Sequence, residues 1–129
     1  MDKRTKQDIQ NVVTREVSRV WDVLCETYPK LCKHNPPVVK LSGRLYRTAG
    51  RAFQELNIVE FGYKFFVANG DYYHNMLAII VPHEVIHIAD YMLYGESEKK
   101  CGHGKMWVKM METYGLEPNP FHNMLITRK

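Results

Sequence analysis

The sequence has few of the features that mark secreted, membrane-spanning or repetitive proteins. Its three cysteines, Cys25, Cys32 and Cys101, form no Cys-x-x-Cys pair, and at least one thiol must stay unpaired. This pattern argues against a disulfide framework and favours a reducing, cytoplasmic setting. No apolar run approaches the length of a bilayer span, and Met1–Lys6 leads directly into a charged amphipathic segment. We therefore expect neither a membrane anchor nor a signal peptide.

The length of 129 residues suits one domain of the α+β class, spanning residues 1–129. Apolar residues recur at helical spacing from Thr5 to Tyr28 and predict a long N-terminal helix that Pro29 ends. A loop should follow over 31–37. Short runs rich in β-branched and aromatic residues then predict a small three-stranded sheet, with strands at 38–41, 44–53 and 57–67.

Helices should make up most of the chain after the sheet. Asp71 suits the N-cap of the first of them, after a turn at 69–71. Because Pro82 removes a helical hydrogen bond, the sequence allows either two helices, at 72–80 and 83–94, or one bent helix. A last helix is predicted at Lys105–Tyr114, ending at Gly115, with a tail over 117–129. Its inward side chains are expected to be Met106, Trp107, Met110 and Met111.

The most informative stretch is an H-E-x-x-H motif formed by His83, Glu84 and His87. Residues four apart lie one above the other on a helix, so both imidazoles can face one metal ion. Glu84 then lies beside that ion, where a general base for a zinc-bound water is needed. The flanking residues are apolar nearly all round, which predicts a buried helix. Unpartnered polar groups there would cost roughly 2 to 7 kcal/mol each, so a metal explains them better than a polar surface.

A catalytic zinc ion takes three protein ligands and leaves one position open. We favour His103 as the third ligand, because Gly102 and Gly104 flank it and permit a tight turn just before the last helix. Asp90 lies one turn beyond His87 and better suits the orientation of an imidazole. Cys101 remains a rival ligand. The candidates of ligand type for the third position are Asp90, Glu96, Glu98, Cys101 and His103.

Other polar residues have less defined roles. His34, His74 and His122 have no partner at ligand spacing, so we expect ordinary surface or satisfied histidines there. A hydrolase also needs a donor for the tetrahedral oxyanion. The sequence supplies residues of the right type without placing any of them at the site: Arg44, Tyr46, Tyr63 and Tyr91.

Three segments together resemble the SprT family of zinc metallopeptidase domains, which includes the Spartan proteases that degrade proteins crosslinked to DNA. They are the stretch 81–87, the Gly-His-Gly of 102–104 followed by 105–112, and 47–52, which is similar to the family's T-A-G-x-A segment. The resemblance covers about 41–116, preceded by a helix and loop at 1–40. It implies a zincin-like fold and one Zn2+ ion held by His83, His87 and His103, with Glu84 as catalytic base. Many members carry a C-terminal zinc ribbon of paired cysteines, which does not follow Tyr114 here.

Positive charge is concentrated in the first part of the chain. Residues 1–51 hold eleven Lys and Arg against five Asp and Glu, while residues 52–129 hold seven against nine. A basic half can bind a polyanion such as DNA, or it can simply be a solvated face. The residues we expect to contact DNA, if it binds, are Arg4, Lys6, Arg15, Arg19, Lys40, Arg44, Arg47 and Arg51.

These observations favour an intracellular zinc endopeptidase whose substrates are proteins on DNA. The first alternative is a zinc-stabilised nucleic-acid-binding or adaptor module without peptidase activity, which the basic half and the missing ribbon suggest. The second is a zinc hydrolase acting on a non-peptide bond at the same site. The intact H-E-x-x-H motif favours the peptidase, because a structural zinc closes its fourth position with a protein ligand and does not need Glu84.

Overall fold

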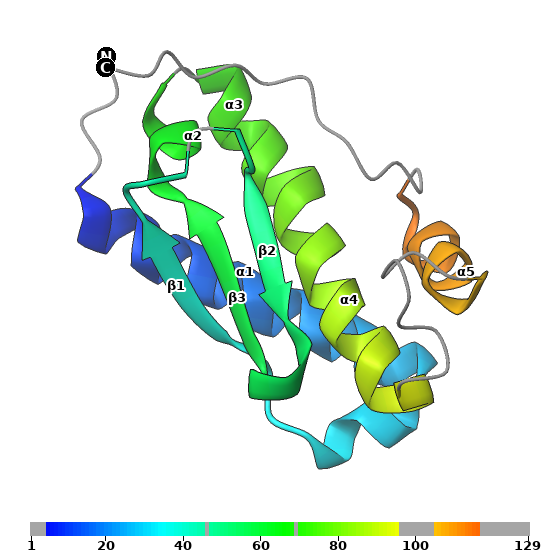
Figure 1. Cartoon of the computed structure of the whole chain (residues 1–129). Helices are drawn as coiled ribbons and strands as arrows, with labels where there is room; N and C mark the ends of the chain where they lie inside the picture. Colours follow the sequence, from blue (N-terminus) through cyan, green and yellow to red (C-terminus); the bar gives the residue numbers. More distant parts are fainter. Residues whose placement is uncertain (1–4, 46, 69, 96–104, 117–129) are drawn as a thin grey trace.

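The computed structural model of the chain describes residues 5–45, 47–68, 70–95 and 105–116. A three-stranded sheet packs against long helices (Figure 1), which confirms the α+β class. In chain order the elements are α1 (Lys6–Thr27), η1 (Pro29–Lys33), β1 (Val38–Ser42), β2 (Gly50–Phe53), η2 (Gln54–Leu56), β3 (Ile58–Gly62), α2 (Tyr63–Val67), α3 (Gly70–Asn75), η3 (Met76–Ile80), α4 (Val81–Tyr94) and α5 (Lys105–Tyr114).

Helix α1 confirms the predicted N-terminal helix. Thr5 caps it through a capping box, in which the hydroxyl of Thr5 accepts from the backbone N–H of Asp8 and the Asp8 carboxylate accepts from the N–H of Thr5. The predicted apolar face is buried from Ile9 to Leu24. Pro29 ends the helix, but residues 29–33 form a 3-10 turn, η1, where we expected a loop from residue 31.

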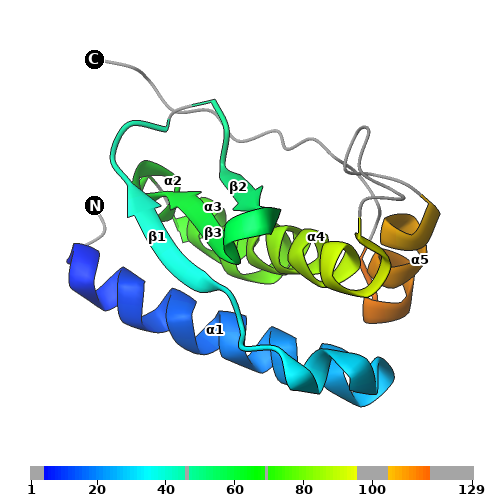
Figure 2. The same ribbon diagram turned by 60° about the horizontal axis from the view of Figure 1, so that its bottom comes forward.

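The sheet has the order β1-β3-β2, with β3 parallel to β1 and antiparallel to β2. Helices α1 and α4 cover one face of it (Figure 2), where Val59 and Phe61 of β3 are fully buried. The predicted second strand was too long, since only Gly50–Phe53 pairs. Strands β1 and β2 lie on opposite sides of β3, two strand spacings or roughly 10 Å apart. Residues 43–49 connect them and must therefore pass from one side of β3 to the other.

The third strand was also predicted too long. It ends at Gly62, and Tyr63–Val67 form the short helix α2 instead. Phe65 and Phe66 are neighbours in sequence and both are fully buried. Neighbouring residues point to opposite faces of a strand but lie only about 100° apart on a helix, so a helical turn can bury both. Aromatic β-propensity was therefore overridden by packing.

The segment containing the H-E-x-x-H motif is one continuous helical run of α3, η3 and α4 (Figure 1), rather than two separate helices. Segment η3 is π-helical, and the N–H of Val81 donates to the carbonyl of Met76, five residues earlier. This wider turn accommodates Pro82, which has no N–H to donate. Helix α3 begins at Gly70, so Asp71 lies in the first turn instead of at the N-cap.

The continuous run also qualifies our expectation about membrane segments. Residues 71–94 form a helix of 24 residues that is long and apolar enough to cross a membrane by length and composition. However, 67% of its most apolar stretch is buried inside the domain, as is usual for a core helix. The expectation that no apolar run approaches this length was therefore wrong, although the burial gives this helix a structural role in the core.

Helix α5 has the predicted bounds and packs against α4. Trp107, Met110 and Met111 are buried as expected, whereas Met106 is only half-buried. Gly115, at φ 106°, ends the helix, and its N–H donates to Glu112. The next N–H, of Leu116, donates to Met111, which completes a Schellman motif.

Candidate active site

The H-E-x-x-H residues lie in the most deeply buried part of α4. Every residue from Val81 to Asp90 is buried, and His83, Glu84 and His87 are only 7 to 8% exposed. The two histidines follow one another at one helical turn, and Glu84 is rotated by about 100° from His83. The two imidazoles and the carboxylate therefore approach one site from two adjacent directions around the helix.

The three side chains converge as the motif predicts. One donor atom from each of His83, Glu84 and His87 can be chosen so that all lie within 4.8 Å of one another. The Nε2 atom of His83 is 3.8 Å from a carboxylate oxygen of Glu84. The two imidazole centroids are 4.9 Å apart, with their planes inclined at 71°. These separations allow both imidazoles to face one ion.

The carboxyl group of Glu84 is strongly affected by its surroundings. Burial raises its pKa from the ordinary value of 4.5 to about 8, because the ionised form loses its hydration. Both its burial and its position beside the histidines are typical of functional carboxylates. A nearby cation would reverse this penalty, since opposite charge favours the ionised form.

Strand β2 forms the wall of the site on the Glu84 side. A Cβ atom added to Gly50 would lie 3.0 Å from Cγ of Glu84 and 3.0 Å from the Phe61 ring, so only glycine fits without displacing them. Immediately after β2, the Nε2 of Gln54 donates to the backbone carbonyl of His87 at 3.1 Å. Strand β2 and the η2 turn that follows it therefore lie against the Glu84 carboxylate and the backbone of a candidate ligand.

Helix α5 contributes a residue to the site that the sequence analysis did not connect with it. The indole of Trp107 stacks on His87, with centroids 4.9 Å apart and planes inclined by only 12°. The same indole meets His83 edge to face at 5.1 Å and 71°. We predicted that Trp107 is buried, but the partner of a buried aromatic residue cannot be read from helical periodicity.

The donor set fits a divalent transition metal. Two imidazoles and one carboxylate are buried together on one helix, and imidazole nitrogen is a preferred ligand of zinc. Without an ion, ionisation of the buried Glu84 carboxyl carries a desolvation cost, and this cost is the reason for its raised pKa. His83 and His87 would hold the ion, and Glu84 would remain beside it.

Some of the expected site residues lie outside the described part of the chain. These are His103 and the rival ligands Glu96, Glu98 and Cys101, together with Tyr46 and His122. The remaining candidate, Asp90, is 3% exposed and lies one turn beyond His87. Its predicted part in orienting an imidazole stays a prediction, as does the choice of His103 as the third ligand.

The other polar candidates are distributed around the fold. His34 and His74 are exposed, which confirms them as surface histidines.

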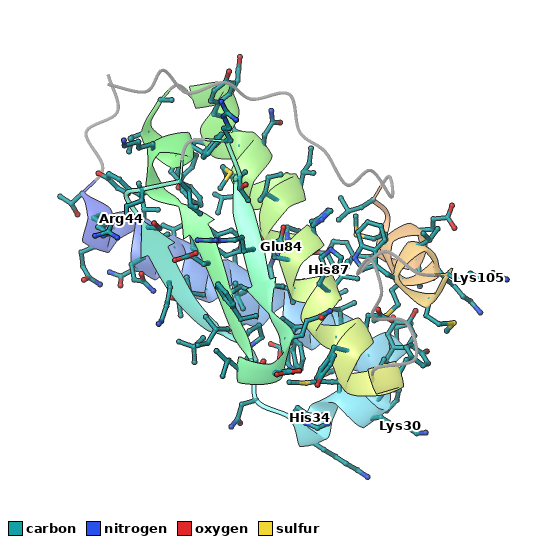
Figure 3. All side chains as sticks on the ribbon, in the orientation of Figure 1. Lys30, His34, Arg44, Glu84, His87 and Lys105 are labelled. Atoms are coloured by element: carbon teal, nitrogen blue, oxygen red, sulfur yellow. The ribbon has the colours of Figure 1, made fainter. Side chains whose placement is uncertain are left out.

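The candidates for an oxyanion donor lie on different elements. Arg44 lies on the β1 side of the sheet, whereas Glu84 and His87 lie on the β2 side (Figure 3), so Arg44 is poorly placed to stabilise an oxyanion. Tyr91 is half-buried one turn after His87. Tyr63 begins α2.

Arg19 and Arg51, which we expected to contact DNA, are engaged within the domain. Arg19 pairs with Glu16 at 2.6 Å and also donates to the hydroxyl of Tyr114. Arg51 pairs with Glu60 at 2.7 Å. Arg15, Arg44 and Arg47 are exposed.

Comparisons with known proteins agree with this geometry. The model of the SprT-like family matches residues 22–122. Protein SprT of Vibrio parahaemolyticus serotype O3:K6 (strain RIMD 2210633) is 32% identical over 82 residues, which are 63% of this chain and 46% of that protein. The chain thus matches less than half the length of this relative. The comparison with solved structures gave no match. On the family match over most of its length, the chain belongs to the SprT-like family.

Proposed function

We propose that this chain is a zinc-dependent endopeptidase in which Glu84 acts as the general base. The observation that carries the proposal is the buried cluster of His83, Glu84 and His87, whose donor atoms lie within 4.8 Å of one another beside an outer strand of the sheet. A third ligand from the segment after α4, with His103 favoured, would leave one position of a zinc ion open.

The roles of the protein groups follow from their positions. Zinc, when bound, would polarise the scissile carbonyl and make a water molecule more acidic. Glu84 is placed to accept the proton of that water and to deliver it to the leaving amine. Burial raises the pKa of Glu84, and a bound cation beside it would favour the ionised form that a general base requires. The buried setting strengthens these interactions, because few water molecules screen them.

Strand β2 is the proposed binding edge for an extended substrate. It is an outer strand, and its first residue, Gly50, lies against Glu84. Unpaired backbone groups of an outer strand can bind a peptide as an additional strand. The opposite edge is less suitable, since Gln10 of α1 donates its side-chain amide to the carbonyl of Val39 in β1 at 3.1 Å. The peptide would then run past the carboxylate at β2.

The proposed substrates are proteins bound or crosslinked to DNA, in an intracellular setting. The motivation is the excess of basic residues in the first 51 positions, of which Arg15, Arg44 and Arg47 are exposed. Cys25 and Cys32 are free thiols, in keeping with a reducing compartment. The ion pairs of Arg19 and Arg51 reduce the positive surface available to DNA.

The test combines metal content with proteolysis. Wild type, Glu84→Gln, His87→Ala and His103→Ala are assayed for bound zinc and for cleavage of a DNA-binding protein, with and without single-stranded DNA. His74→Ala is the matched control, because it removes an exposed histidine from the same helical run. We expect one zinc ion per chain, no cleavage by Glu84→Gln despite bound zinc, and loss of zinc in His87→Ala and His103→Ala.

The outcomes separate the alternatives. Zinc binding without cleavage of any protein, combined with salt-sensitive DNA binding that Glu84→Gln leaves unchanged, would replace the peptidase with a nucleic-acid-binding module. Cleavage that DNA does not stimulate, and that charge reversal at Arg15, Arg44 and Arg47 does not alter, would reject the DNA part alone. Retained cleavage by Glu84→Gln would remove this residue from the mechanism.

A further inference from the structure

We propose that Trp107 is a positioning residue for the metal-binding histidines, holding the imidazole planes of His87 and His83 in the orientation that an ion requires. The inference rests on the proposed metal site, but it concerns α5, a separate element. Trp107 is 1% exposed and contacts both rings, one face to face and one edge to face. It is thus placed to fix both rings at once.

The need for such a residue follows from the torsions of histidine. The χ2 angle of an imidazole is broad, so a histidine side chain alone does not fix the plane of its ring. A metal ion binds along the nitrogen lone pair, which lies in that plane. A flat indole stacked at 12° on His87 restricts rotation of the ring about χ2 and leaves its edge, with the nitrogen atoms, directed past the indole. Binding then requires less ordering of the ligands.

His87 is held from a second direction as well. Gln54 donates to its backbone carbonyl from the η2 turn, while Trp107 packs on its ring from α5. The sheet side thus fixes the backbone of this residue, and α5 fixes its ring. Groups that orient ligands in this way contribute about 10- to 100-fold to metal affinity.

If the role of Trp107 were purely structural, its truncation would affect metal binding only through lost stability, as other truncations in the core would. Trp107, Met110 and Met111 are all buried in α5, so any truncation there weakens the packing of the helix. Met110→Ala is therefore a control for lost α5 packing. Trp21→Leu is a second control, because Trp21 is a buried tryptophan of another helix, α1, and its indole donates to the carbonyl of His34.

The experiment measures binding of Co2+ to the metal-free full chain, by its visible absorption spectrum and by competition with a chelator. Trp107→Leu should bind Co2+ about 10- to 100-fold more weakly and with an altered spectrum, since the spectrum reports ligand geometry. Trp107→Phe, which keeps an aromatic face, should recover most of the affinity. Met110→Ala and Trp21→Leu should lose stability but keep both affinity and spectrum.

Unchanged affinity and spectrum in Trp107→Leu would overturn the inference while leaving the metal site intact. So would a loss of affinity that follows stability equally in all variants. If Trp107→Leu does not fold, Trp107→Met replaces it in the same comparison with Trp107→Phe. Failure of the wild-type chain to bind Co2+ would instead reject the proposed function, on which this inference rests.

Discussion

Replacing Glu84 by glutamine should stabilise the metal-free protein, increasingly so as the pH rises. In the folded chain, burial raises the pKa of this carboxyl from 4.5 to about 8. Below pH 4.5 the group is protonated in both the folded and the unfolded chain, and no penalty exists. Between these two pH values the unfolded chain releases the proton while the folded chain retains it, so the free energy of unfolding falls with rising pH. Above pH 8 the penalty is complete.

The magnitude follows from the two pKa values. Linkage gives a loss of about 2 kcal/mol at pH 6 and about 4 kcal/mol at pH 8, relative to a chain without this carboxyl. These are upper values, because local relaxation and entry of water lower the cost of a buried charge. The neutral amide of Glu84→Gln has nearly the same shape and does not titrate in this range. Its own burial cost is independent of pH and does not affect the slope.

The assay is urea unfolding of chelator-treated wild type and Glu84→Gln from pH 5 to pH 8.5. The difference in unfolding free energy should grow by a few kcal/mol across this range. Glu112→Gln, which changes an exposed carboxylate of α5, is the matched control for removal of a negative charge. With saturating zinc, the growth with pH should shrink, because the cation favours the ionised carboxylate. A pH-independent difference for Glu84→Gln without metal would refute the account of its burial.

Three further substitutions test individual contacts. Gly50→Ala should lower peptidase activity about 10- to 100-fold while zinc stays bound, because the new methyl group would displace Glu84; full activity would show that the carboxylate can move without loss. Gln54→Ala should cost about 0.5 to 1.5 kcal/mol in thermal or urea unfolding, through loss of its hydrogen bond to His87, and an unchanged midpoint would argue that water replaces the amide. Gly115→Ala should cost about 1 to 2 kcal/mol, because alanine strains a φ of 106°; equal stability would mean that the end of α5 rearranges.

The helices and the paired histidines could be predicted because their signals are local. The apolar face of α1 repeats at helical spacing over 22 residues, and Pro29 ends it. The separation of His83 and His87 by one turn makes their convergence a property of the helix itself. Burial of α4 was also predictable, because residues 81–90 offer apolar side chains in nearly every direction.

The errors fall where distant packing decides between local alternatives. Phe65 and Phe66 have high strand propensity, yet the core buries both on the helical turn of α2. Asp71 resembled an N-cap, but the helix starts one residue earlier. The contact of Trp107 with the histidines joins α5 to α4, and no spacing in the sequence encodes it. The position of Gly50 against Glu84 is of the same kind.

The π-helical segment η3 sets the angular phase of the whole of α4, the next segment of the helical run. Because η3 already holds one more residue per turn than an α-helix, a further residue inserted between Met76 and Ile80 would add its own step of about 100° and rotate His83 and His87 by that angle relative to α3. The histidines would then face away from Trp107, and Glu84 away from Gly50. This segment should therefore accept changes of side chain, such as at the exposed Ile79, far more readily than the insertion of a residue.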